Sequence, residues 1–75
     1  MREAKPLLLA VREPEGWSRP AQRSCAHVLF DDGSWRTAQV LGWLRDPRRG
    51  WIVHLRWPDA REQWSLYDRR YMHPL

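Results

Sequence analysis

Arginine and tryptophan are the residue types in this sequence best suited to binding chemistry. A guanidinium group donates paired hydrogen bonds that match phosphate oxygens, and an exposed indole beside arginine can stack on a nucleobase. The arginines and tryptophans that gather in polar segments or flank them are Arg45, Arg48, Arg49, Arg69, Arg70, Trp43 and Trp57. We predict that these residues form a nucleic-acid-binding surface. The alternative, that the arginines form a solvated rim that keeps a tryptophan-rich protein soluble, stays open.

The six tryptophans also bear on how a small core is built. Large side chains fill a small core efficiently, and we expect Trp51 and Trp64 to serve that purpose. Trp17 lies in a segment interrupted by prolines and could anchor that segment to the domain.

Histidine and cysteine give little support for catalysis or metal binding. His27, His54 and His73 lie in separate strand-like segments, and their spacing matches no local zinc motif. The single cysteine, Cys25, excludes an intrachain disulfide, and no residues complete a nucleophilic triad with it. We therefore expect a protein that is not an enzyme and that carries no metal and no cofactor.

Short apolar segments separated by polar turns predict an antiparallel sheet. Residues 31–34 carry the Asp–Gly pair that tight hairpin turns favour, and further polar turns are expected at 45–50 and 58–61. Gly42, in the middle of a long strand, predicts a bend or bulge. The predicted strands are 26–30, 35–44, 51–57, 62–67 and 71–73.

Alternation of side chains assigns faces to the two longest strands. One face of the strand at 51–57 carries Trp51, Val53, Leu55 and Trp57. One face of the strand at 35–44 carries Trp35, Thr37, Gln39, Leu41 and Trp43.

Residues 1–23 are predicted to be an extended N-terminal tail, and residues 24–75 the folded domain. Prolines interrupt the first segment, so neither a helix nor a strand can run far there. The apolar run at 7–11 could pack on the domain in an extended form or remain mobile. It is much shorter than the ~20 residues of a membrane span, and no signal-peptide cleavage pattern follows it. We expect no membrane association and a cytoplasmic location.

Length and charge limit the possible functions. A chain of 75 residues forms one domain and has little room for a deep catalytic cleft. Thirteen Lys and Arg against nine Asp and Glu give a net charge of +4, which permits nucleic-acid binding without requiring it. The sequence therefore indicates a non-catalytic binding module whose partner is DNA, RNA, a protein or a peptide. It does not define an oligomeric state.

Residues 28–73 resemble the Tudor and chromo-barrel group of SH3-like barrels. The segment Trp-Arg-Thr-Ala-Gln-Val at 35–40 is similar to a Tudor pattern of an aromatic residue, an alanine and a valine. The segment Trp-Ile-Val-His-Leu-Arg-Trp at 51–57, followed by Trp64 and Arg69, resembles the chromo-barrel pattern. The resemblance implies an all-β fold, a small five-stranded antiparallel SH3-like barrel.

The resemblance also implies an aromatic groove or cage for a peptide or a methylated side chain. Its candidate residues are Trp35, Trp57, Trp64 and Tyr67. In the simplest register Arg36 occupies a position where chromo-barrels often carry a cage aromatic, and its charge would repel a methylammonium group. A protein- or peptide-interaction module is therefore the alternative function.

The segment 58–71 has a helical alternative as well. Ala60, Trp64, Tyr67 and Tyr71 would share one face of a helix that begins at Pro58. The resemblance favours a strand at 62–67, a single turn, and a last short strand.

Overall fold

All the strands in the described part of the chain lie in one antiparallel sheet. The computed structural model describes residues 3–15 and 19–75, with side chains in the second range from Ser24 onward. The strands are β1 (Ala10–Val11), β2 (Arg19–Leu29), β3 (Trp35–Asp46), β4 (Gly50–Arg56), β5 (Glu62–Leu66) and β6 (Met72–Pro74). The described residues contain no helix, and so none long and apolar enough to cross a membrane. The prediction of an all-β fold is confirmed.

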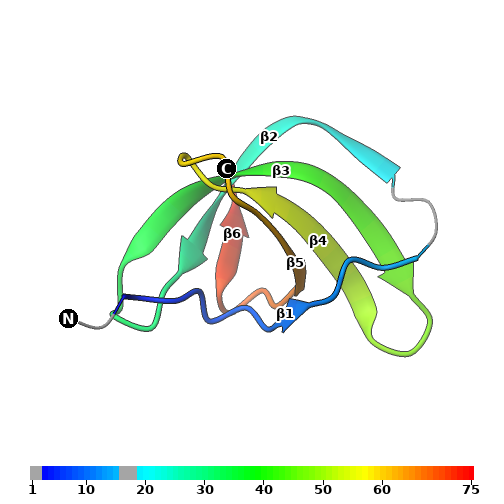
Figure 1. The fold of residues 1–75 in the computed structure, drawn as a ribbon, viewed down its shortest axis with the longest axis horizontal. Coiled ribbons are helices and arrows are strands. Elements are labelled where there is room, and N and C mark those ends of the chain that lie inside the picture. Colours follow the sequence, from blue (N-terminus) through cyan, green and yellow to red (C-terminus); the bar gives the residue numbers. More distant parts are fainter. Residues whose placement is uncertain (1–2, 16–18) are drawn as a thin grey trace.

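The six strands lie in the order β1-β5-β4-β3-β2-β6. Strands β2 to β5 follow one another as adjacent hairpins because short turns connect them, while β6 pairs with β2 and β1 pairs with β5. The sheet bends strongly (Figure 1) but does not close, since β1 and β6 form its two edges. The prediction of a five-stranded barrel is corrected in both respects: the sheet has six strands and is open.

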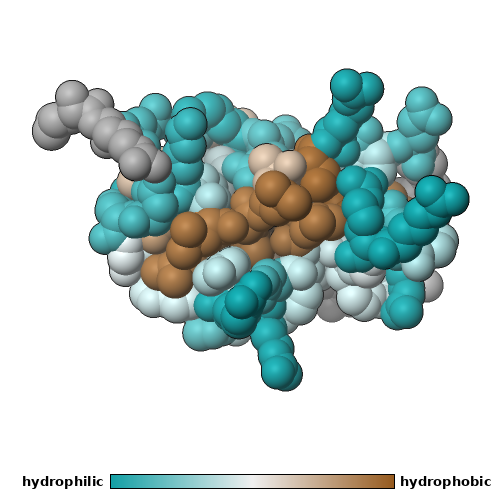
Figure 2. Space-filling view, turned by 90° about the horizontal axis from the view of Figure 1, so that it is seen from below, coloured by the Kyte–Doolittle hydropathy of each residue, from teal (hydrophilic) through white to brown (hydrophobic). Residues whose placement is uncertain are grey.

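The N-terminal segment supplies the additional strand. The Leu8 side chain is only 2% exposed and belongs to the core, and Pro6 forms an isolated bridge with Phe30. Of the two alternatives for residues 7–11, the structure shows packing on the sheet. Figure 2 views the molecule from below Figure 1, the side along which this segment runs, and shows an apolar stripe there. Leu9, 66% exposed, is the most exposed large apolar residue of the segment.

The other elements lie close to their predicted positions. Strand β2 begins at Arg19, inside the segment predicted to be a tail, and the predicted anchor Trp17 lies outside the described residues. The helical alternative for 58–71 is wrong, because β5 forms there. The Tyr71 N–H then donates to the Asp68 carbonyl at 3.0 Å, which closes a single turn before β6.

Strand β3 contains the irregularity that Gly42 predicted. Its register with β4 shifts between Val40 and Gly42, so that Leu41 is the extra residue of a bulge. Ala38 and Val40 face the core before the bulge, and Trp43 packs against the core after it. The predicted face that joined Trp43 to Gln39 is therefore wrong, because the bulge shifts the alternation by one residue.

The core combines one face of the long strands with the N-terminal segment. Its buried members are Leu8, Ala26, Val28, Phe30, Ala38, Val40, Val53, Leu55 and Met72. Trp43 and Trp57 pack against this cluster, whereas Trp51 is 43% exposed. The expectation that Trp51 and Trp64 fill the core is corrected: Trp51 lies beside a hairpin tip, and Trp64 packs outside the cluster.

Candidate nucleic-acid interface

The hairpin that joins β3 to β4 presents an exposed indole under a guanidinium group. Arg45 and Trp51 are cross-strand partners, and the guanidinium carbon of Arg45 lies 5.6 Å from the Trp51 ring centroid. Trp43 stands behind Trp51, edge to face at 6.2 Å, and Tyr67 lies 5.4 Å from Trp43. The half-buried ring of Trp43, itself in contact with the half-buried ring of Tyr67, thus packs against Trp51, while the Trp51 indole remains accessible to a partner.

The loop between β5 and β6 brings further arginines toward this hairpin. The Tyr67 N–H donates to the Trp51 carbonyl at 2.8 Å, and this bond connects the start of the loop to the first residues of β4. Arg69 and Arg70 follow in this loop, and both side chains are exposed. The structure therefore places the two predicted arginine groups in neighbouring loops.

The arginines of this region differ in whether a carboxylate forms a salt bridge with them. Arg49 pairs with Asp46 at 3.1 Å, and Arg70 pairs with Asp68 at 2.6 Å. Within the described residues, the guanidinium groups that form no salt bridge here are those of Arg45, Arg48 and Arg69. We call these three groups together with the exposed ring of Trp51 the hairpin surface.

Aspartates organise the turns of the sheet, and several arginines are their salt-bridge partners. Asp46 accepts the backbone N–H groups of Arg48 and Arg49 at 2.8 and 3.0 Å, and these bonds hold its pKa below the usual value. The same kind of turn, with an aspartate of lowered pKa paired with a nearby arginine, recurs at Asp32, Asp59 and Asp68. The arginines paired with these aspartates therefore have a structural role in the turns.

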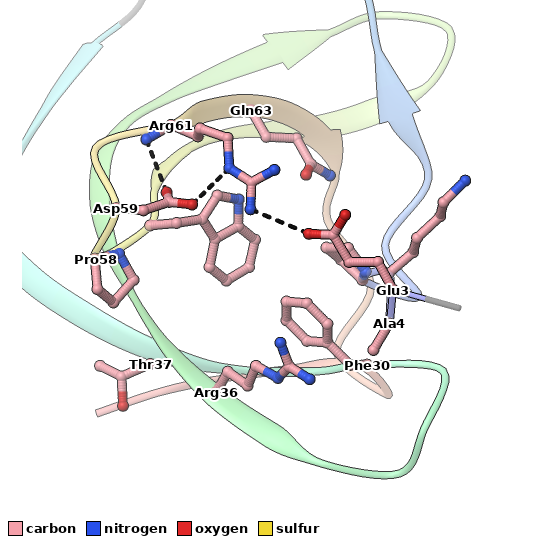
Figure 3. Close-up of a pocket in the computed structure, with 12 residues that line it drawn as sticks. Glu3, Ala4, Phe30, Arg36, Thr37, Pro58, Asp59, Arg61 and Gln63 are labelled. Carbon is pink, nitrogen blue, oxygen red and sulfur yellow. Dashed lines mark hydrogen bonds and ion pairs between the residues drawn. The ribbon is translucent and has the colours of Figure 1, made fainter. Parts of the chain in front are cut away.

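A pocket lies at the other end of β4. Its volume is about 530 Å³, and its walls include the edge-to-face pair Phe30 and Trp57, whose centroids are 5.2 Å apart. Figure 3 shows Arg36 and Arg61 entering the pocket from opposite sides. Glu3 of the N-terminal segment forms a further part of the wall. Trp57 therefore lies with this pocket, which we call the Trp57 pocket, and not with the hairpin surface.

The four residues of the predicted aromatic groove have different ring partners. Trp35 stacks on His73 at 4.6 Å, and Trp64 stacks on His54 at 4.0 Å. Tyr67 contacts Trp43, and Trp57 contacts Phe30. No ring contact in the described part of the chain joins two of the four.

The histidines and the cysteine are distributed over the sheet. His27 and His73 are cross-strand partners on β2 and β6, and His54 Nε2 lies 2.7 Å from a Glu62 carboxylate oxygen. Cys25 is exposed on β2. Among residues 3–15 and 19–75 there is no group of three His, Cys, Asp or Glu side chains that could hold a metal ion.

Sequence reasoning missed Trp51 as a surface residue and missed the pocket. Trp51 alternates with Val53 and Leu55, which suggested burial, yet it also stands directly opposite Arg45 across a tight turn. That cross-strand pairing was a usable signal for an arginine–indole contact. Nothing local in the sequence links Arg36 to Arg61, because the fold alone brings them to one pocket.

Comparisons with protein-family models, with curated proteins and with solved structures found no match to this chain.

Proposed function

We propose that this protein is a non-catalytic nucleic-acid-binding module and that the hairpin surface is its contact face. The observation that carries the proposal is the position of the Arg45 guanidinium 5.6 Å above the exposed Trp51 ring. One face of such an indole can stack on a base, while neighbouring guanidinium groups bind phosphates. Arg48 and Arg69 supply those groups, because no carboxylate in the described chain neutralises them through a salt bridge.

We also infer that the bent sheet is a variant of the SH3-like barrel, extended by β1. The succession of hairpins from β2 to β5, the bulge at Leu41 and the single turn before β6 support this inference. Barrels of this type serve many unrelated functions, so the proposed binding activity depends on the surface and not on the fold.

The alternative, a peptide-binding groove, has less support. It requires Trp35, Trp57, Trp64 and Tyr67 to act together, whereas each has its own ring partner. The net charge of +4 also favours a polyanion over a neutral peptide.

Anisotropy of labelled DNA and RNA oligonucleotides, single- and double-stranded, tests the proposed function at several salt concentrations. The two phosphate contacts of Arg48 and Arg69 predict that log Kd rises by roughly 1.4 to 1.8 per log unit of salt. Absence of binding to every oligonucleotide at about 50 mM salt would refute the proposal. A salt-independent affinity would also contradict it, since the phosphate contacts would then contribute nothing.

A further inference from the structure

We propose that the Trp57 pocket holds one unpaired base, with its phosphate, of a single-stranded nucleic acid; this inference rests on the proposed function and deepens it. A volume of about 530 Å³ suits a small organic group. The pocket combines an aromatic pair with two guanidinium groups that approach from opposite sides (Figure 3). Proteins stack bases on aromatic rings and on guanidinium planes. The Arg36 guanidinium carbon lies 4.2 Å from the centroid of the buried Phe30 ring, so the surfaces left for a base are the Trp57 ring and the guanidinium planes.

The two guanidinium groups are held in place before any ligand arrives. Arg36 donates from Nε to Ser34 Oγ and from Nη2 to Asp32 Oδ2, both at 3.1 Å. Arg61 donates from Nε to Asp59 Oδ2 at 2.6 Å and from Nη2 to Glu3 Oε1 at 3.4 Å. In both groups Nη1 donates no hydrogen bond within the described residues and is free for a ligand. Because the groups are already oriented, binding costs less side-chain entropy.

The polar groups of the pocket bear on the choice of ligand. Its wall carries the positive groups of Lys5, Arg36 and Arg61 and the negative groups of Glu3 and Asp59. The salt bridges of Arg36 with Asp32 and of Arg61 with Asp59 and Glu3 offset most of these charges, so the hydrogen-bond donors of the pocket indicate its ligand rather than its net charge. A nucleotide offers a planar ring for Trp57 and acceptors, those of its phosphate included, for the two Nη1 groups.

A requirement for an unpaired base implies a preference for single strands. In a duplex each base is stacked and paired, and its removal costs several kcal/mol. Trp51 and Trp57 lie at opposite ends of β4, which separates them by roughly 20 Å at about 3.3 Å per residue. Single-stranded sites on small β-barrel modules span roughly 4 to 16 nucleotides. One strand can therefore contact the hairpin surface and place another of its bases in the Trp57 pocket.

The test follows the indole N–H signals of the intact protein by NMR, assigned with Trp51→Phe and Trp57→Phe variants. Titration with adenosine, guanosine, cytidine and uridine 5′-monophosphates should shift the Trp57 signal more than the Trp51 signal. Inorganic phosphate alone should shift the Trp57 signal much less. Equal shifts with phosphate, or shifts only with a methyl-lysine peptide, would overturn the inference.

A second measurement does not depend on altering a half-buried tryptophan. Arg36→Gln should weaken binding of a single-stranded hexanucleotide at least fivefold and leave duplex binding nearly unchanged. Arg56→Gln removes the same charge outside the pocket lining and serves as the control. If oligonucleotides shift the indole N–H signal of Trp51 but never that of Trp57, the pocket inference fails and the proposed function stands. If mononucleotides shift Trp57 but no oligonucleotide shifts Trp51, the proposed hairpin surface fails instead.

Discussion

The guanidinium carbon of Arg45 lies 5.6 Å from the centroid of the Trp51 ring, and the two residues are direct partners across the β3–β4 hairpin. This contact keeps the arginine near a ring that is 43% exposed. A base that stacks on Trp51 would meet a cation already in position. The contact therefore defines where mutations should affect binding most.

Replacing Trp51 by alanine should weaken nucleic-acid binding by about 5- to 150-fold, the effect expected from losing one stacked base. Trp35→Ala is a matched control, because Trp35 is 42% exposed and stacks on His73 at 4.6 Å, away from the hairpin. Anisotropy titrations of both variants provide the comparison. Equal losses in the two variants would show that the hairpin indole has no special part in binding.

Arg48→Gln should reduce the salt dependence of binding by roughly 0.7 to 0.9 log units per log unit of salt, the value for one lost phosphate contact. Arg49→Gln should have a smaller effect, because the Arg49 guanidinium already pairs with Asp46 at 3.1 Å. The measurement is the slope of log Kd against log salt for each variant. A larger change for Arg49 than for Arg48 would contradict this assignment.

Leu8→Ala should lower the free energy of unfolding by about 2–5 kcal/mol, because it leaves a cavity in the core. Leu9→Ala, at a side chain that is 66% exposed, should change it by no more than about 0.5 kcal/mol. Chemical denaturation of both variants tests whether the N-terminal segment is part of the folded domain. An unchanged stability in Leu8→Ala would mean that this segment contributes nothing.

Stability should fall in acid. The pKa values of Asp32, Asp46, Asp59 and Asp68 lie below the usual 3.8, mainly through hydrogen bonds from turn residues. A carboxyl group whose pKa is lower in the folded than in the unfolded state stabilises the fold at pH values above its unfolded-state pKa. That contribution is lost as the pH falls through the folded pKa. Tm should therefore be steady near neutral pH and drop below about pH 4.

The Asp46→Asn variant provides the control for the acid effect. It removes one titrating group and keeps an oxygen that can accept the same backbone N–H bonds. The acid-induced drop in Tm should be smaller in this variant than in the parent protein. A Tm that does not change with pH in either protein would show that the turn aspartates make no net contribution.

Ala60→Gly should stabilise the protein by about 1 kcal/mol, because L-residues other than glycine are strained at positive φ. Ala60 has a φ of 71° in the turn between β4 and β5. Gly50→Ala, at a φ of 86°, should destabilise by a similar amount of about 1 kcal/mol. Thermal unfolding measures both, and a shift of the same sign in the two variants would contradict the prediction.

The parts of the fold that depend on neighbouring residues could be predicted from the sequence. The Asp–Gly turn at 31–34 and the bend at Gly42 follow from local backbone preferences. The position of Trp43 could not be predicted, because a bulge at Leu41 reverses the face on which later residues lie. Packing of residues 7–11 on the sheet stayed one of two alternatives, because the two residues of β1 pair with Trp64 and Ser65, far away in sequence.

The candidate site was predictable to a smaller extent. Clustering of arginine in the sequence located the hairpin, and Arg45, Arg48 and Arg49 do lie there. It could not show that Arg49 would be bound by Asp46, since this depends on turn geometry. Arg36 and Arg61 line one pocket only because the bent sheet brings β3 close to the turn after β4.

The early placement of Leu8 in the chain has a consequence for synthesis on the ribosome. The residues around it emerge before their hydrogen-bond partners, Leu29 and Leu66. Non-local pairings of this kind slow folding, because a long loop must close before the contacts form. Until β5 has emerged, the Leu9 carbonyl lacks its hydrogen-bond partner and the leucine side chains of this segment lack a complete core. A chaperone would be most useful at this stage of synthesis.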